Sequence, residues 1–176
     1  YGVENPQVDV TIRNGTIDAS ASGVGYALWL YEGGTLSLNS VTVKGGVATD
    51  GTIESIAHCN ITQYQGNGAA ALSLRDNAQV KDIVGGSLTG AVYHAFGVYV
   101  SAGASIGSIR SCTITSAMDY SIVLNEHGAT IGAIYMTEGT ITGIRGYDNL
   151  AAITGGTVPG DTPWTCEAIR MSGGEI

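Results

Sequence analysis

The stretch Val10-Thr11-Ile12-Arg13-Asn14-Gly15-Thr16-Ile17 decides the fold, because its aliphatic pattern returns along the whole chain. The pattern is an aliphatic residue, one or two others, a second aliphatic residue, about four others and a third aliphatic residue. Its seven copies are Val10/Ile12/Ile17, Leu36/Leu38/Val43, Ile53/Ile56/Ile61, Val80/Ile83/Leu88, Ile106/Ile109/Ile114, Ile131/Ile134/Ile141 and Leu150/Ile153/Val158.

The copies recur at a period typical of a solenoid. Subtracting the numbers of their last residues gives spacings of 26, 18, 27, 26, 27 and 17. Each repeat of a solenoid is one turn that buries its apolar side only against its neighbours. No helical period of 3.6 residues persists. We therefore predict an all-β fold, a right-handed parallel β-helix of about seven turns, with the hand given by the rule for parallel crossovers.

Composition supports one domain over residues 1–176, with residues 1–9 as a cap or a link. Tyr1 in place of an initiator methionine, and Ile176 where an eighth copy would begin, predict a chain excised from a longer protein. The net charge is −8, and the seven basic residues are scattered. Nucleic acid is therefore not an expected partner. No stretch approaches the roughly 20 apolar residues that insert into a membrane.

A second, shorter strand is predicted at five places, before four of the copies and before the point where an eighth copy would begin. The strands read Leu28-Trp29-Leu30, Leu72-Ser73-Leu74, Val98-Tyr99-Val100, Ile122-Val123-Leu124 and Ile169-Arg170-Met171, with the middle residue pointing outward. The two coils of about 18 residues lack this pattern, so we predict that they lack the strand. Glycine, valine or cysteine stands two positions before each final aliphatic residue, and we predict that this small residue also points inward.

The chain resembles right-handed parallel β-helix repeat proteins on three runs: Val10 to Ile17, Ile106-Gly107-Ser108-Ile109 and Gly139-Thr140-Ile141-Thr142. These runs are similar to glycine- and threonine-rich repeats of secreted or cell-surface bacterial proteins. The wider superfamily includes pectate lyases, polygalacturonases and phage tailspikes, so the resemblance implies a fold and leaves several activities open. It also implies that the chain is secreted or lies at the cell surface.

One group of charged residues is the candidate for catalysis. In pectate lyases a calcium cluster and a basic residue act on the sugar, and the nearest counterpart here is Glu54, Lys81, Asp82 and Arg110. Glu54 and Lys81 follow equivalent aliphatic residues, so they also suit a simple cross-strand ion pair. The signatures of polygalacturonases are absent. We predict no metal or cofactor site, and His58, His94 and His127 are expected at the surface because their spacing suits no zinc site.

The three cysteines are expected to be structural. Cys59 and Cys112 fall in the small inward column with Gly86 between them, which places them about 9.6 Å apart, beyond the reach of a disulfide. Cys166 has no evident partner.

Two outward surfaces suggest binding functions. Trp29, Tyr31 and Tyr99 form a group that could stack on sugar rings, interrupted by Ser73 on the turn between them. Thr-x-Thr steps at Thr113/Thr115 and Thr140/Thr142 resemble ice-binding surfaces, although threonine also simply suits an exposed strand. Asp18, Lys44 and Pro159 interrupt the second threonine column.

Three functions remain open on this evidence. The first is a non-catalytic structural or adhesive module with glycans or other cell-surface polymers as partners. The second is a polysaccharide lyase or glycoside hydrolase, and the third is an ice-binding protein. The oligomeric state does not follow from the sequence.

Overall fold

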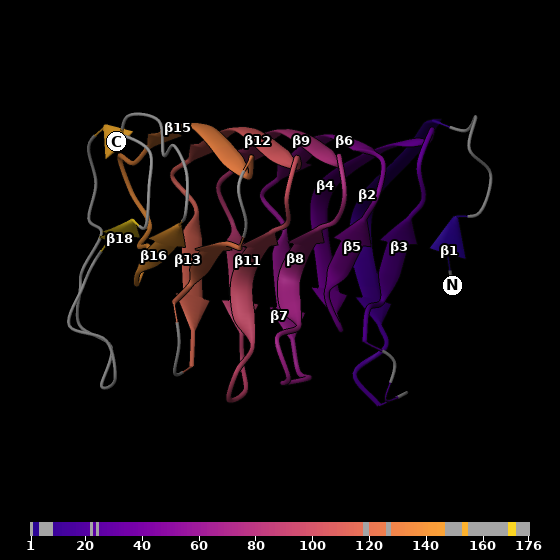
Figure 1. Cartoon of the computed structure of the whole chain (residues 1–176). Coiled ribbons are helices and arrows are strands. Elements are labelled where there is room, and N and C mark those ends of the chain that lie inside the picture. Colours follow the sequence, from indigo (N-terminus) through magenta and orange to yellow (C-terminus); the bar gives the residue numbers. More distant parts are fainter. Residues whose placement is uncertain are drawn as a thin grey trace.

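The computed structural model describes residues 9–146 except 22, 24, 118, 119, 126 and 127, together with the short strands β1 (Gly2–Val3), β17 (Ile153–Thr154) and β18 (Ile169–Met171). Its described elements are all β-strands, and every strand pair is parallel. The chain is a parallel β-helix whose coils follow one another along the rod, from indigo to orange in Figure 1. This confirms the predicted fold class.

One side of the rod is a sheet of short strands in the order β1-β3-β5-β8-β11-β14-β16-β18. Its inner members are β3 (Leu28–Leu30), β5 (Val47–Thr49), β8 (Ala70–Leu74), β11 (Phe96–Val100), β14 (Ile122–Leu124) and β16 (Ile144–Gly146). All five short strands expected from the sequence lie in this sheet.

The other two sides come from longer strands that bend. Both β2 (Asp9–Asp18) and β4 (Thr35–Lys44) turn a corner within one strand, at Asn14 and Ser40, whose φ angles are +52° and +55°. In later coils the corner separates two strands, and His58 and Ser111 take the same backbone conformation there. The first halves of β2 and β4 continue into β6 (Thr52–Ala57), β9 (Gln79–Val84), β12 (Ser105–Arg110), β15 (Thr130–Tyr135) and β17. Their second halves continue into β7 (Asn60–Gln63), β10 (Ser87–Gly90) and β13 (Thr113–Ser116).

The aliphatic copies stack in the interior as the period predicts. Ile61, Leu88 and Ile114 are register partners on successive coils, and each is fully buried. Ile56, Ile83, Ile109 and Ile134 form a second such column. The buried side chains make one hydrophobic cluster that extends from Ala27 to Ile144. Each fully buried aliphatic side chain contributes about 1.5–3 kcal/mol, so these columns hold the coils together.

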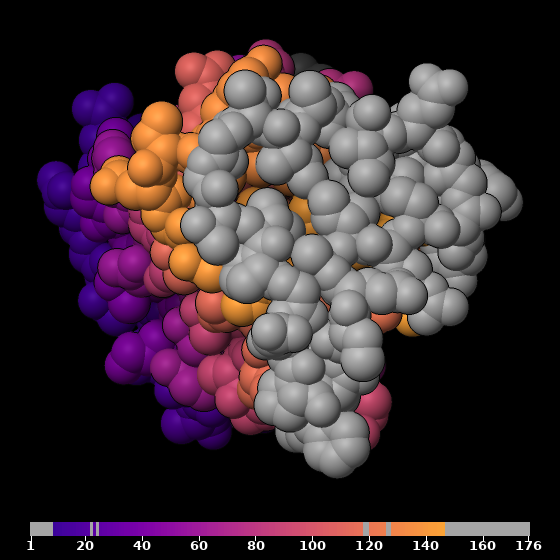
Figure 2. Space-filling model, turned by 90° about the vertical axis from the view of Figure 1, so that its left-hand side faces the viewer, coloured from indigo at the N-terminus to yellow at the C-terminus, as the bar shows by residue number. Residues whose placement is uncertain are grey.

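The described residues form about five complete turns rather than the seven predicted. The first copy lies in β2, in a winding whose preceding strand β1 is only two residues long. Of the seventh copy, only Ile153 lies in a described strand. Figure 2 looks onto the end where the described coils finish, with the orange coil in front of the magenta and indigo ones.

The short coils do contain a strand on the first side, contrary to the prediction. Val47–Thr49 forms β5 and Ile144–Gly146 forms β16, both paired in the common register. Thr49 and Gly146 occupy the position at which other coils have an aliphatic residue. Because the prediction relied on that residue, it missed these two strands. What is shortened is the connection before the strand: only Gly45 and Gly46 separate β4 from β5.

Candidate functional site

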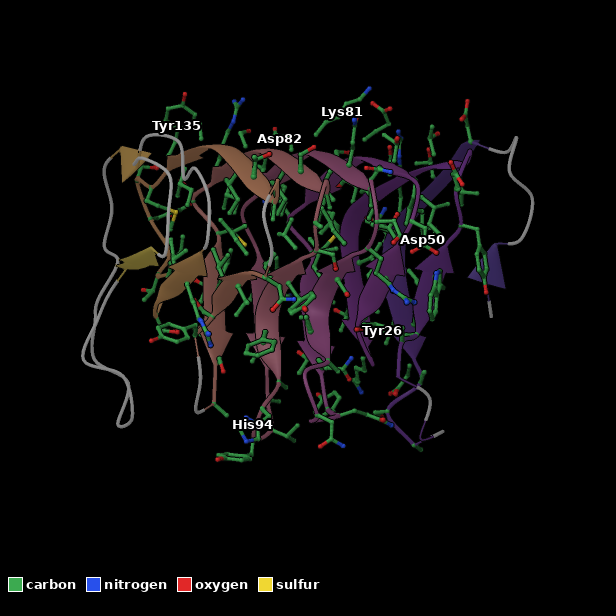
Figure 3. The ribbon with its side chains drawn as sticks, viewed as in Figure 1. Tyr26, Asp50, Lys81, Asp82, His94 and Tyr135 are labelled. Atoms are coloured by element: carbon green, nitrogen blue, oxygen red, sulfur yellow. The ribbon has the colours of Figure 1, made fainter. Side chains whose placement is uncertain are left out.

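The three outward surfaces of the rod have different chemistry. We call the outer side of β3, β5, β8, β11 and β14, with the loops that enter it, the aromatic face. The outer side of β6, β9, β12 and β15 is the charged face. The outer side of β7, β10, β13 and the second halves of β2 and β4 is the threonine face. In Figure 3, Lys81, Asp82 and Tyr135 lie along one edge of the rod and His94 at the opposite edge.

The charged face brings the four candidate catalytic residues together as two ion pairs. Lys81 Nζ lies 2.7 Å from Glu54 Oε2, and Arg110 Nε lies 3.3 Å from Asp82 Oδ1. Ser108, two residues before Arg110 on β12 and the register partner of Asp82, donates a hydrogen bond to the Asp82 carboxylate and accepts one from Arg110. The predicted Glu54–Lys81 pair is therefore present, and the Asp82–Arg110 pair is a second one.

These pairs lie on an open strand surface. The Lys81 and Arg110 side chains are 57% and 56% exposed, so solvent screens the pairs strongly. A carboxylate lies within ion-pair distance of each of these two cations, so the positive charges of Lys81 and Arg110 are both compensated. No group of three or more histidine, cysteine and acidic side chains suited to a metal occurs among the described residues. Catalysis by this group stays a prediction.

The threonine face has the two columns that the sequence predicts. The first runs through Thr16, Thr42, Asn60, Ser87 and Thr113, and the second through Asp18, Lys44, Thr62, Thr89 and Thr115. Hydroxyl and amide groups are linked between coils: Ser87 Oγ donates to Asn60 Oδ1 at 2.9 Å, and Thr115 Oγ1 to Thr89 Oγ1 at 3.3 Å. The two columns form a regular array of mostly small polar side chains.

Asp18 and Lys44 interrupt the second column as an ion pair. Lys44 Nζ lies 2.8 Å from Asp18 Oδ2. Hydrogen bonds from Lys44 and then from Ser20 lower the pKa of Asp18 from 3.8 to about 2, and the same carboxylate raises the pKa of Lys44. The regular part of the column therefore begins at Thr62.

The aromatic face carries a compact cluster around Trp29. The rings of Trp29 and Tyr31 are stacked, with centroids 5.7 Å apart and planes 12° from parallel. Tyr26 meets Trp29 edge-on at 5.9 Å, and the guanidinium of Arg75 lies 5.0 Å from the centroid of the Trp29 ring. The indole Nε1 donates to Asp50 Oδ2 at 3.1 Å. Trp29 is thus held from several sides, whereas Tyr31 keeps 40% of its surface exposed.

Tyr99, the third aromatic residue expected to bind sugar, lies apart from this cluster. Trp29, Ala48, Ser73 and Tyr99 are consecutive register partners, so two small residues separate the rings instead of the single Ser73 expected. The separation is three strand spacings, roughly 14 Å. The coil of β5, which the sequence analysis missed, accounts for the difference. Tyr99 stacks on Phe96 at 6.0 Å.

Several residues of this face were not selected from the sequence. Asp50 and Arg75 each follow a short strand directly, as Tyr31 does, and these three positions lie on successive coils. Tyr64 and Tyr93, 43% and 58% exposed, come from two loops at the entry to the face. The loops are joined, because Gly68 N donates to His94 O at 2.9 Å. The sequence offered one signal for these two loops, because each of them carries a tyrosine shortly before a short strand.

The cysteines and histidines lie as predicted where they are described. Cys59 and Cys112 are free and buried, two coils apart, with Gly86 at the register position between them. Burial raises the pKa of both thiols, that of Cys112 to about 12. His58 and His94 are exposed. His127, Cys166 and Pro159 lie outside the described residues.

Comparisons with protein-family models, with curated proteins and with solved structures gave no match. No helix of the described part of the chain is long and apolar enough to cross a bilayer. A functional conclusion therefore depends on the chemistry of the three faces.

Proposed function

We propose that this chain is a non-catalytic β-helix module that binds glycan through its aromatic face. The observation that supports this is the segregation of aromatic side chains. Of the nine aromatic residues whose side chains are described, Tyr135 lies on the charged face, and Tyr64 follows β7 directly, beside Lys44 of the threonine face. The other seven lie on the aromatic face or in its loops: Tyr26, Trp29, Tyr31, Tyr93, Phe96, Tyr99 and Tyr120.

The exposed rings suit sugar recognition. Aromatic rings offer a flat, rigid apolar surface with little conformational entropy to lose, and the C–H groups of a sugar ring pack on such a surface. Tyr31 and Tyr93 are 40% and 58% exposed, and polar groups of Asp50 and Arg75 lie beside the Trp29–Tyr31 pair. Scattered aromatic residues are normal on protein surfaces, but a set of which seven of nine members gather on one of three faces is not scattered.

The proposed setting is a structural or adhesive part of a secreted or cell-surface bacterial protein. The resemblance to glycine- and threonine-rich repeats of such proteins, within the pectate-lyase-like superfamily, supports this setting. Polysaccharide cleavage is less well supported, because both cations of the Glu54, Lys81, Asp82 and Arg110 group are neutralised by carboxylates. An assay for new reducing ends or unsaturated sugars checks that alternative, and product formation lost in Lys81→Ala would restore it.

A glycan array with matched variants tests the proposal. We expect the wild-type chain to bind a subset of glycans, and Tyr31→Ala to weaken this binding by about tenfold or more, as for a central aromatic contact. Tyr135→Ala is the control, since Tyr135 is 46% exposed but lies on the charged face. Failure of the wild-type chain to bind any glycan, or equal losses in the two variants, would contradict the proposal.

Ice binding by the threonine face is a second candidate function, and the register of the strands on that face favours it. Three successive coils present paired small polar residues at Asn60/Thr62, Ser87/Thr89 and Thr113/Thr115. Thr140 continues the first column on the next coil, where Ile141 bridges to Ile114, but the Thr142 hydroxyl oxygen is buried. We expect thermal hysteresis in the wild-type chain and its loss in Thr113→Tyr, which would disrupt the regular array. Thr130→Tyr on the charged face is the control. No hysteresis in the wild-type chain would remove this candidate.

A further inference from the structure

Arg75 is a surface cation that forms no ion pair with any described carboxylate, in a chain that has an excess of carboxylates. The chain has 15 acidic and seven basic residues. Lys44, Lys81 and Arg110 each form an ion pair with an acidic side chain. Arg75 is exposed, and no described acidic side chain forms an ion pair with its guanidinium, which instead lies against the Trp29 ring. The charge of this arginine is therefore available to a ligand.

The position of Arg75 is set by the fold. Leu30, Thr49 and Leu74 are register partners at the ends of β3, β5 and β8, and Tyr31, Asp50 and Arg75 follow them directly. Backbone hydrogen bonds from Asp50 N to Leu30 O and from Arg75 N to Thr49 O continue the ladder past the strand ends. An exposed aromatic ring and a cation thus lie two coils apart, roughly 9.6 Å along the rod.

Trp29 and Asp50 hold this pair in place. The indole ring contacts both Tyr31 and Arg75, and its Nε1–H donates to Asp50 Oδ2 on the coil between them. A guanidinium stacked on an aromatic ring loses little further freedom when it forms a bidentate contact, because its plane is already oriented. Trp29 and Asp50 are therefore positioning residues, and Tyr31 and Arg75 are the groups that a ligand can reach.

We infer that the glycan bound at this cluster carries an anionic group, a carboxylate or a sulfate ester, and that Arg75 is its counter-ion. This inference rests on the proposed function. Planar guanidinium groups bind carboxylate and sulfate-like oxyanions through two parallel hydrogen bonds. A sugar ring on Tyr31 would place a charged substituent within reach of Arg75.

The charges around the cluster restrict further which anionic glycans can bind there. Glu32 and Asp76 adjoin Tyr31 and Arg75 in the chain and are exposed, and Asp50 lies on the coil next to Arg75, with its Oδ1 buried and without a hydrogen-bond partner among the described residues. The whole chain carries a net charge of −8. Like charges disfavour a dense polyanion at such a surface. The site therefore selects an isolated anionic sugar, such as a single charged residue at the end of an otherwise neutral glycan, over a polyuronate.

Matched glycans test the inference. The probes are one neutral oligosaccharide, the same oligosaccharide with a terminal glucuronate or a terminal sulfated sugar, and polygalacturonate. We expect a terminal charge to raise the affinity of the wild-type chain about tenfold or more, with an advantage that shrinks when salt is raised. The glucuronate and sulfate arms distinguish the two anionic groups. Tighter binding of polygalacturonate than of either capped glycan would overturn the preference for an isolated charge.

Variants separate Arg75 from the rest of the surface. Arg75→Gln should abolish the preference for the charged glycan, lowering the affinity for the charged glycan about tenfold more than the affinity for the neutral one, because Tyr31 is retained. Arg13→Gln is the control, since Arg13 is exposed and has no described ion pair but lies on β2, away from the aromatic face. Circular dichroism checks that both variants are folded. Equal binding of neutral and charged glycans, unchanged in Arg75→Gln, would overturn the inference while the proposed function stands. Failure to bind any glycan would overturn both.

Discussion

Gly86 stands at a corner of the rod where a side chain has no room. It has a φ angle of +73°, and a Cβ atom there would lie 2.1 Å from the carbonyl oxygen of Cys59. We expect Gly86→Ala to destabilise the chain by about 2 kcal/mol or more, from backbone strain together with the clash. Urea unfolding measures the change.

Gly15 provides a matched control at the same position of the repeat. Gly15 pairs with Val41, and the same column continues through Cys59 to Gly86. Apart from its two chain neighbours, no described residue has an atom within 4 Å of the place where a Cβ of residue 15 would lie. Gly15→Ala should therefore change the free energy of unfolding by less than about 0.5 kcal/mol. Equal losses in the two variants would mean that the clash at Gly86 is relieved elsewhere.

The buried thiol of Cys112 makes stability depend on alkaline pH. Burial raises its pKa from 9.0 to about 12 in the folded chain. Above about pH 9 the unfolded chain loses this proton while the folded chain keeps it, so stability falls as the pH rises towards 12. The fall approaches about 1.4 kcal/mol per pH unit for one thiol. Cys112→Ala should show a shallower decline in urea unfolding at pH 9 to 11, and identical slopes would contradict the expected titration.

Residues within one column could be predicted from the sequence, whereas contacts between columns could not. The positions of Cys59, Gly86 and Cys112 follow from counting along the repeat, and the structure confirms them. The contact of Arg75 with Trp29 depends on how two long side chains lean across an intervening coil. That coil carries Val47-Ala48-Thr49, which lacks the aliphatic pattern, so the spacing of the aromatic face could not be counted correctly.

At the scale of elements, Gln63 stabilises the shortened corner between β4 and β5. Its amide nitrogen donates to Gly25 O at 2.6 Å, with Gly45 O and Ala70 O at 3.4 Å, and its Oε1 accepts from Gln65 N. The side chain is fully buried, so it satisfies backbone groups that water does not reach. The sequence alone does not explain why a glutamine is buried among aliphatic residues. The reason is the shortened corner, whose backbone groups need a hydrogen-bond partner.

Replacing Gln63 tests this role. Gln63→Leu should lower the free energy of unfolding by about 1–3 kcal/mol, because buried carbonyl groups lose their donor. Thr62→Val, one position earlier and on the outer face, should change it by less than about 0.5 kcal/mol. Thermal and urea unfolding of both variants provide the comparison. A stable Gln63→Leu variant would show that another donor reaches these carbonyl groups.

The strands themselves were largely predictable, because a buried strand requires apolar residues at fixed intervals. The spacing of two between Leu36 and Leu38 becomes three between Ile53 and Ile56, and the register shifts at this point as the pattern requires. Strands β5 and β16 were missed for the opposite reason. Short strands held between well-formed neighbours tolerate Thr49 or Gly146 at an inward position, since pairing on both sides fixes the backbone.

For the whole molecule, stability should be greatest in the middle coils. A coil of a solenoid packs only against its two neighbours, so an interior coil has twice the contacts of a terminal one. Ile83 is fully buried and lies between Ile56 and Ile109, whereas Ile12 is only partly buried. Ile83→Ala should cost about 2–5 kcal/mol and Ile12→Ala clearly less. Hydrogen exchange of the wild-type chain should show the slowest amides in β9 and β10, and uniform protection along the rod would contradict this gradient.

The corner formed by Gly45 and Gly46 shows that the winding closes there without a loop. A connection of two residues keeps β4 and β5 in register with every neighbouring strand. The longer connections that carry Tyr64 and Tyr93 are thus additions to the rod and are not needed to build it. They can be exchanged for other sequences of similar span, so the chain can serve as a scaffold on which new recognition segments are grafted side by side at a fixed pitch.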